Sequence, residues 1–342
     1  MNLKRLVLMA TLLTCSLAVH ADDLVNFGDY PVSNQRDCFA GGFGDYDAWR
    51  DWLVERNPNN KTEQDKQVAR ERFSNAIPAA DHAHFKQSLT CNWFTYSVDG
   101  GEVHGYIIQP KDADEALPVL IYNRGGNHNY GGVVFGNLFS WQFQYADEGF
   151  VVIGSQYRGT FVNEINPDFS DEFGGADVND VLELINMVPY LEHADEDRIG
   201  MMGHSRGSMQ TMLALRHATR LKAVAVLAGN YDLVAGLEAR PEMENVYRAR
   251  ISDYEANKEE ALAARSALQW VDELDESVPI LIAHGQDDQR VLANQSLQLA
   301  QALQAKGHPY KLVMYPQDDH GFRMHRDEVN REVVAWFEKY LR

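Results

Sequence analysis

Short apolar runs alternate with helix-like segments through most of the chain after residue 118. The runs have the length of strands and span residues 119–122, 150–155, 199–202, 223–227, 279–283 and 310–315. Apolar residues recur at helical spacing between them, near 138–148, 177–191, 208–216, 294–306 and 328–340. Continuous apolar strands that alternate with helices are typical of a parallel sheet covered on both faces. The pattern therefore predicts an α/β fold with a mostly parallel, twisted sheet.

Three other segments depart from this alternation. Residues 93–98 and 103–109 alternate around Asp99-Gly100-Gly101, which predicts an antiparallel hairpin leading into the sheet. Residues 22–89 predict an accessory region with helices at 45–56, 62–75 and 77–89, so the α/β domain is expected at 90–342. Residues 231–277 form a charged, mostly helical insertion after the run at 223–227. It is expected over the carboxyl ends of the strands, as a lid or as inert covering.

The first 21 residues have the pattern of a secretory signal peptide. Lys4 and Arg5 precede an apolar stretch at 6–18, and small residues follow up to Ala21. Lipidation of Cys15 is the weaker alternative, because Thr14 is a poor residue before a lipidated cysteine. No later apolar run reaches about 18 residues, so no membrane anchor is expected after cleavage. The protein is predicted to be secreted or periplasmic.

Composition narrows the partners and the compartment. The chain has 31 basic and 50 acidic residues and a formal net charge of −19, which argues against nucleic acid and anionic lipid as partners. Cys38 and Cys91 are an even count in an exported protein, which favours a disulfide over two separate buried thiols. His82 and His84 lack a carboxylate or cysteine at ligand spacing, so no metal and no cofactor are expected.

The segment Gly203-His204-Ser205-Arg206-Gly207 carries the first sign of chemistry. It lies between the apolar run at 199–202 and a helical pattern from 208 onward. A G-x-S-x-G sequence between a strand and a helix is typical of a nucleophile elbow, in which a sharp turn presents the serine hydroxyl to a base. An ordinary glycine-rich turn is the alternative reading. Ser205 is thus predicted to be the nucleophile of a serine hydrolase.

A serine nucleophile needs a base and an acid that orients the base, and in α/β-hydrolases these follow in the order serine, acid, histidine. Asp287 and Asp288 come after the run at 279–283, and His320 comes after the run at 310–315. All three residue types therefore follow predicted strands at the same edge of the sheet. The neighbouring carboxylates Asp318 and Asp319 are interpreted as solvated loop residues.

The oxyanion formed during acyl transfer needs hydrogen-bond donors, which are usually backbone N–H groups. One donor is expected from Arg206, the residue after the nucleophile. The other is expected from Gly125 or Gly126, in the loop that follows the run at 119–122. A plain glycine-glycine turn is the alternative for that loop.

These residues resemble the prolyl oligopeptidase family of α/β-hydrolases over roughly residues 90–342. The similarity rests on residues 96–100 with Gly105-Tyr106, on Tyr157-Arg158-Gly159 with 174–178, on His284-Gly285 with Asp288 and Val291, and on His320 before a glycine. The resemblance implies a serine peptidase with an α/β-hydrolase fold, and its register selects Asp288, rather than Asp287, as the triad acid. It also suggests Glu242 and Glu244 as ligands for a peptide amino terminus.

Two features depart from the family pattern. Family peptidases often carry a β-propeller, and residues 22–89 are too short to form one. The oxyanion loop reads Arg124-Gly125-Gly126 where His-Gly-Gly or Tyr-x-Gly is more usual, so backbone donors are expected to bind the oxyanion. A serine peptidase for short peptides is the leading hypothesis. A carboxylesterase for small acyl or carbohydrate esters and a non-catalytic binding protein are the alternatives, and the substrate is a small molecule or short peptide in either enzyme.

Overall fold

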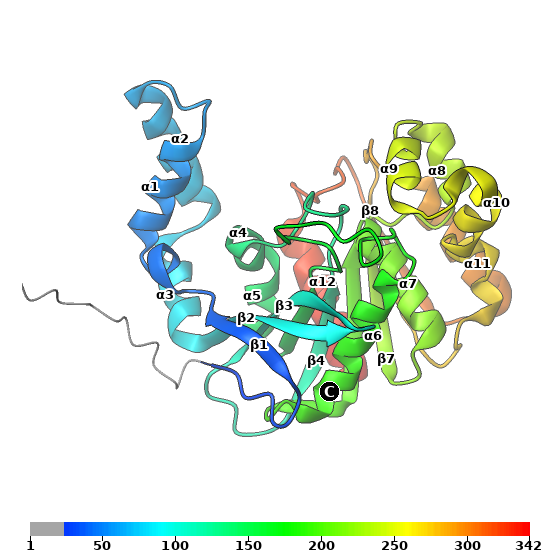
Figure 1. Ribbon diagram of the computed structural model, residues 1–342, viewed down its shortest axis with the longest axis horizontal. Coiled ribbons are helices and arrows are strands. Elements are labelled where there is room, and N and C mark those ends of the chain that lie inside the picture. The colour runs from blue at the N-terminus through cyan, green and yellow to red at the C-terminus, as the bar shows by residue number, and fades with distance from the viewer. Residues whose placement is uncertain (1–23) are drawn as a thin grey trace, which may run out of the picture.

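One nine-stranded sheet runs through the computed structural model, which describes residues 24–342 (Figure 1). The strand order is β1-β2-β3-β5-β4-β6-β7-β8-β9. The strands are β1 Val32–Asp37, β2 Leu89–Val98, β3 Gly101–Pro110, β4 Leu117–Asn123, β5 Val151–Ser155, β6 Ala194–His204, β7 Leu221–Leu227, β8 Ile280–Gly285 and β9 Tyr310–Tyr315. Pairings from β1 to β5 are antiparallel and those from β5 to β9 are parallel, so the predicted mostly parallel sheet is confirmed.

Helices cover both faces of the parallel strands, as the continuous apolar runs require. Alternate strand residues such as Val119, Ile121 and Ile199 pack in one core, and Leu120 and Met202 pack in the other. The first core is closed by α6 Asp177–Met187, α7 Arg206–His217 and α11 Asn294–Lys306. The second is closed by α4 Phe135–Asn137, η3 Leu138–Gln142, α5 Phe143–Asp147 and α12 Arg326–Leu341. Helices on both faces leave the carboxyl ends of the strands open for a site.

The N-terminal region carries three helices, α1 Tyr46–Arg56, α2 Glu63–Ala76 and α3 Ala79–Ser88, close to the predicted ranges. Thr62 and Asp65 form a capping box at the start of α2. Trp49 of α1 packs edge-on against Phe135 of α4, with ring centroids 4.8 Å apart, and Phe85 of α3 contacts η3. The α1 and α2 helices project from the sheet at the left of Figure 1. The predicted signal peptide lies outside the described residues.

Strand β1 was not predicted from the sequence. It holds a single apolar residue, Val32, and each of its residues is half-buried or exposed. An edge strand is held by backbone pairing along one side, so it needs no apolar pattern of its own. Here β1 pairs with β2, which joins the accessory region to the sheet. Strand β1, which belongs to the accessory region, is therefore part of the same sheet as the strands of the α/β domain.

Cys38, the residue after β1, and Cys91, near the start of β2, form a disulfide. The backbone N–H of Cys38 also donates to the carbonyl of Cys91 at 2.8 Å. We expect Cys38→Ser together with Cys91→Ser to lower the free energy of unfolding by about 4 kcal/mol, since the bond closes a loop of 53 residues in the unfolded chain. Urea unfolding of the two proteins measures this difference. Titration of two free thiols in the denatured, unreduced protein would contradict the disulfide.

The insertion folds as α8 Leu233–Ala239, α9 Met243–Arg250 and α10 Tyr254–Ala264, followed by two 3-10 turns, η5 Ala267–Gln269 and η6 Val271–Glu273. It lies beyond the carboxyl end of β7, at the upper right of Figure 1. Arg265 fastens it to the rest of the protein by donating to the carbonyls of Phe173 at 2.9 Å and Glu172 at 3.1 Å. The insertion therefore borders the edge of the sheet where the chemistry was predicted.

Neither a membrane span nor a metal cluster is found in residues 24–342. No helix in that range combines the length and apolar character needed to cross a bilayer. No group of three or more histidine, cysteine, aspartate or glutamate side chains in it could hold a metal ion. His82 is buried and donates to the carbonyl of Phe43 at 2.8 Å, whereas His84 contacts Asp147. The two histidines thus have separate structural partners.

Candidate active site

Ser205 lies in a sharp turn between β6 and α7. Its backbone has φ 60° and ψ −122°, a conformation that residues other than glycine rarely adopt. A Cβ on Gly203 would lie 2.0 Å from the carbonyl oxygen of Gly207, and a Cβ on Gly207 would lie 1.9 Å from that of Asn123. Both positions therefore need glycine, which explains why the turn can be tight enough to lift the serine hydroxyl from the sheet.

Ser205, His320 and Asp288 form one hydrogen-bonded chain. The Oγ of Ser205 is 2.8 Å from Nε2 of His320, and Nδ1 of His320 is 2.7 Å from Oδ2 of Asp288. The three residues follow β6, β9 and β8, whose carboxyl ends meet at one edge of the sheet. This is the geometry that activates a serine: a base on the hydroxyl and a carboxylate that orients the base.

The carboxylate of Asp288 is buried and surrounded by donors. Its Oδ1 accepts from the backbone N–H groups of Arg290 at 2.8 Å and Val291 at 3.0 Å. Its Oδ2 lies 3.1 Å from Nε2 of His284, in addition to His320. Burial raises the pKa of the Asp288 carboxyl, but the hydrogen bonds from His284 and His320 outweigh it and hold that pKa well below its usual range. Asp287, in contrast, is exposed.

His284 extends the hydrogen-bonded chain beyond the acid. It is fully buried, and its Nε2 faces two acceptors, Asp288 and the carbonyl of Val291 at 2.9 Å. Nε2 must therefore carry the proton, which leaves Nδ1 to accept from the hydroxyl of Ser296 at 2.7 Å. In the sequence, His284 was noted as one of the residues that carry the family resemblance. The structure shows that one of its hydrogen-bond partners is the predicted triad acid.

Two residues hold the loop that carries His320. His204 donates from Nε2 to the carbonyl of His320 at 2.6 Å, and burial lowers the pKa of His204 to about 3, so its ring is neutral. The interpretation of Asp318 as a solvated carboxylate is wrong. Asp318 is buried and accepts from the backbone N–H groups of Met324 and His325, at 3.2 and 2.9 Å. The tight return of the loop removes its carboxylate from solvent.

The loop after β4 passes directly against the nucleophile. A Cβ on Gly125 would lie 3.2 Å from the Cβ of Ser205. Gly126 has φ +75°, and a Cβ there would lie 2.0 Å from the carbonyl oxygen of Tyr130. In the described part of the chain, the backbone N–H groups of Gly125, Gly126 and Arg206 have no hydrogen-bond partner. Free N–H groups beside a serine hydroxyl are what an oxyanion needs.

Two buried arginine side chains hold this loop by hydrogen bonds to its carbonyl groups. The sequence did not predict this role for either side chain. Arg124 donates to the carbonyls of Gly125 at 3.0 Å and His128 at 2.8 Å. Burial lowers the pKa of Arg124 to about 10, so it stays charged at neutral pH. The Nη1 of Arg206 donates to the carbonyl of Gly126 at 3.0 Å. The chain thus uses side chains to fix the carbonyls of a loop whose N–H groups stay free.

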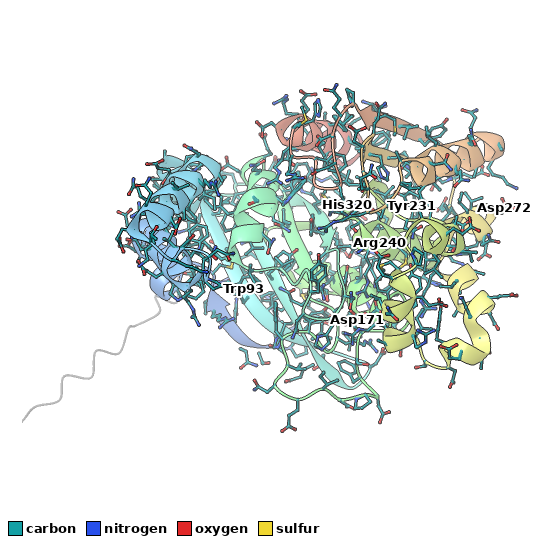
Figure 2. The ribbon with its side chains drawn as sticks, turned by 90° about the horizontal axis from the view of Figure 1, so that it is seen from above. Trp93, Asp171, Tyr231, Arg240, Asp272 and His320 are labelled. Carbon is teal, nitrogen blue, oxygen red and sulfur yellow. A yellow bond between two sulfur atoms is a disulfide. The ribbon has the colours of Figure 1, made fainter. Side chains whose placement is uncertain are left out.

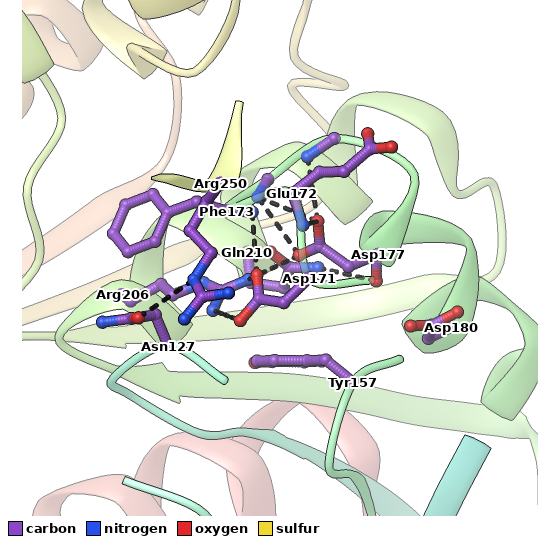
Figure 3. Close-up of polar contacts among 12 residues, drawn as sticks. Asn127, Tyr157, Asp171, Glu172, Phe173, Asp177, Asp180, Arg206, Gln210 and Arg250 are labelled. Atoms are coloured by element: carbon purple, nitrogen blue, oxygen red, sulfur yellow. Dashed lines mark hydrogen bonds and ion pairs between the residues drawn. The ribbon is translucent and has the colours of Figure 1, made fainter. Parts of the chain in front are cut away.

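Arg206 is neutralised by two carboxylates (Figure 3). Its guanidinium contacts Asp171 and Asp177 at 2.6 Å each, and it lies between the rings of Tyr157 and Phe173. Burial raises the pKa of Asp171, but the charge of Arg206 outweighs it and holds that pKa far below its usual value. Asp177 belongs to a motif noted in the sequence, yet its partner lies 29 residues away. Such long-range pairs leave no local pattern.

A cavity of about 1110 Å³ opens around Ser205 and His320. The oxyanion loop, η3, helices α8 and α9 and residues 290–298 line it, so the insertion forms one wall. Viewed from above, His320 and Arg240 lie toward the middle of the molecule and Asp272 at its outer side (Figure 2). Glu242 pairs with Arg240 at 2.8 Å and Glu244 pairs with Lys258. Neither glutamate lines the cavity, so the suggested role in binding a peptide amino terminus has no support here.

Known proteins similar to this chain are found by family profile and by sequence. Residues 137–342 match the profile of the prolyl oligopeptidase family. Dipeptidyl-peptidase 5 of Porphyromonas gingivalis is 27% identical over 258 residues, which are 72% of this chain and 37% of that protein. The uncharacterized peptidase YtmA of Bacillus subtilis is 25% identical over 248 residues, which are 72% of this chain and 91% of that protein.

Solved structures share the fold. A puromycin-hydrolyzing peptidase of Mycobacterium tuberculosis superposes with a TM-score of 0.62 and 24% identity, covering 74% of this chain and 40% of that one. An acylaminoacyl peptidase of Pyrococcus horikoshii superposes with a TM-score of 0.64 and 23% identity, covering 76% and 44%. This chain therefore spans less than half of the dipeptidyl-peptidase and of both solved structures. The shared part is the α/β-hydrolase fold.

Proposed function

Because this chain belongs to the prolyl oligopeptidase family of serine peptidases, we propose that it is an exported peptidase that cleaves short peptides through a covalent acyl-enzyme. The observation that carries the proposal is the hydrogen-bonded chain from Ser205 through His320 to Asp288. A non-catalytic binding protein has no need of a strained serine aligned with a histidine and a buried carboxylate.

In the proposed reaction, Ser205 Oγ attacks the scissile carbonyl while Nε2 of His320 takes its proton. Asp288 accepts from Nδ1 of His320, which fixes the tautomer and stabilises the imidazolium. His320 then gives the proton to the leaving amine, and the acyl group stays on Ser205. Water activated by the same histidine releases the acyl group and restores the free serine.

The N–H groups of Arg206 and of Gly125 or Gly126 are the proposed oxyanion donors. Support comes from their position beside Ser205 and from their freedom from other acceptors among the described residues. Arg124 and Arg206 hold the carbonyls of Gly125 and Gly126 at 3.0 Å, so the donors need no reorganisation when the oxyanion forms.

Export is proposed from two features. The first is the signal-like pattern at residues 1–21, and the second is the disulfide between Cys38 and Cys91, a bond that forms and persists in oxidising compartments. A secreted or periplasmic location fits both. Comparison of the mass of the exported protein with that of the full chain tests whether residues 1–21 are removed.

A panel of activated substrates tests the peptidase proposal against the esterase alternative. We expect aminoacyl and Xaa-Pro p-nitroanilides to be cleaved, with small p-nitrophenyl esters also turned over because an acyl-enzyme serves both bonds. The measurement is kcat/KM for each compound with the wild-type protein and with Ser205→Ala as the blank. Cleavage of the esters with no activity on any anilide or short peptide would favour the carboxylesterase and contradict the peptidase.

A further inference from the structure

Two arginines in the active-site cavity have no anionic partner among the residues that the structure describes. Of the cavity's arginines, Arg124 and Arg206 are committed to the oxyanion loop, and Arg240 pairs with Glu242. In residues 24–342, neither Arg290 nor Arg326 has a carboxylate oxygen within 4.0 Å. The chain has 50 acidic and 31 basic residues, so acidic residues outnumber basic ones, yet these two side chains remain without a carboxylate partner in that range. The cavity therefore keeps positive charge available to a ligand.

Arg326 is the one of the two that lies beside the base. It is the first residue of α12 and is half-buried. Its guanidinium carbon stands 4.9 Å from the ring centroid of Trp141, and its Nη2 contacts the carbonyl of Gly321, the residue after His320, at 3.4 Å. Trp141 in turn stacks on His204, which packs against His320. Trp141 and Arg326 thus form the cavity wall next to the catalytic histidine.

This wall faces the leaving group of a substrate. His320 must hand its proton to the leaving atom, so the leaving group has to lie beside its ring. The acyl part has room at the other side, where the insertion presents apolar residues such as Leu233, Val246 and Tyr247. Figure 1 shows the α4–α5 segment and helices α8 and α9 on opposite sides of the strand ends. The leaving group of a substrate therefore faces a charged and aromatic wall, whereas its acyl part faces apolar side chains.

We propose that Arg326, stacked on Trp141, binds the free terminal carboxylate of a short leaving group, one or two residues long. A guanidinium stacked on an aromatic ring can still donate from its edge, and apart from the one N–H that faces Gly321, the edge of Arg326 matches both oxygens of a carboxylate. The half-buried setting strengthens the pairing by limiting competition from water. This inference rests on the proposed peptidase function and names its substrate class: peptides cleaved close to their carboxyl terminus.

The test compares the tripeptide alanyl-alanyl-phenylalanine with its carboxamide, which differs only in the terminal charge. Release of phenylalanine or phenylalaninamide is followed by chromatography to give kcat/KM. We expect the acid to be preferred, and we expect Arg326→Gln to reduce the acid-to-amide ratio by about tenfold, as loss of a hydrogen-bonded ion pair does. Arg326→Lys restores only part of the ratio, since an ammonium cannot bind both oxygens in parallel.

Arg331→Gln is the matched control, because Arg331 is an exposed arginine on the same helix, outside the active-site cavity. It removes the same charge and leaves the ratio unchanged. An equal fall in Arg331→Gln would show a general field effect and overturn the proposal. Equal turnover of acid and amide by the wild-type protein, or a ratio insensitive to Arg326→Gln, would also overturn it while leaving the peptidase function intact.

Binding to Ser205→Ala separates the two failures. Calorimetry with this variant measures the affinity for the tripeptide and for its amide without turnover. If the amide binds more weakly than the acid, and Arg326→Gln in the same background abolishes this difference in affinity, the carboxylate site is supported. This holds even if the wild-type protein cleaves neither compound. Equal affinities for acid and amide contradict the site. Absence of fluorophosphonate labelling of Ser205 contradicts the proposed function alone.

Discussion

Ser205→Ala is expected to abolish turnover and to prevent covalent labelling by a fluorophosphonate. Removing the nucleophile of a serine hydrolase lowers kcat by about 10⁴- to 10⁶-fold, because the remaining hydrogen-bond donors cannot replace the covalent step. The hydroxyl is the only group removed, and within residues 24–342 its hydrogen-bond partner is Nε2 of His320 at 2.8 Å. The fold should therefore survive, which circular dichroism and thermal unfolding can verify.

Ser208→Ala provides the control for this experiment. Ser208 lies in the first turn of α7 and is fully buried, and its single hydroxyl hydrogen faces the carbonyls of Gly203 and Leu227, at 2.9 and 2.8 Å from Oγ. Its loss should cost about 1 kcal/mol of stability, as for a typical hydrogen bond, and leave labelling in place. Labelling that persists in Ser205→Ala, or disappears only in Ser208→Ala, would remove the nucleophile assignment.

The sheet, and the edge of it that carries the site, could be predicted because both depend on residues that are close together in the sequence. A parallel strand buried on both faces must be apolar along its length, so the strands after residue 118 can be recognised from the sequence. Chain direction then decides which loops share an edge, and Ser205, Asp288 and His320 each follow such a strand. The elbow also depends on neighbours in sequence, since Gly203 and Gly207 are the positions where a Cβ would clash.

The parts that were missed depend on partners distant in sequence. Strand β1 is recognised only through its pairing with β2, about 60 residues later. The Arg206 guanidinium contacts Asp171, which lies in a loop, and Asp177, the first residue of α6, and no local sequence pattern links these carboxylates to Arg206. Asp318 looked solvated because acidic loop residues usually are, and its burial follows from the return of residues 324 and 325 onto it. Each miss is a polar contact that tertiary structure creates.

The positions of these missed contacts have a shared consequence. The side chain of Arg206 is buried beneath the loop, while its backbone N–H is a proposed oxyanion donor. Arg206 thus contributes a backbone donor to the oxyanion site and a side chain that supports the neighbouring loop. Asp171 and Asp177 balance the charge of that side chain. The loop is shaped by buried ion pairs that would be costly to break, which favours a rigid site over an adaptable one.

Asp288→Asn is expected to lower kcat/KM by about 10⁴-fold, because it disturbs the tautomer of His320. All four contacts of the Asp288 carboxylate come from donors: two backbone N–H groups on Oδ1, and His284 and His320 on Oδ2. An asparagine has one accepting oxygen, so its NH2 must face one of these pairs. If the NH2 faces the histidines, Nδ1 of His320 becomes an acceptor, and protonated Nε2 can no longer take the serine proton.

Asp287→Asn is the matched control for that variant, one residue earlier in the same loop. The Asp287 side chain is exposed, so its neutralisation should change kcat/KM by less than about threefold, as expected for a surface charge. Both variants are compared on one activated ester and one anilide, with fluorophosphonate labelling rates as a readout of Ser205 reactivity. A large loss in Asp287→Asn with little loss in Asp288→Asn would transfer the role of the triad acid to Asp287. It would also mean that the short contact between Asp288 and His320 does not orient the base during turnover.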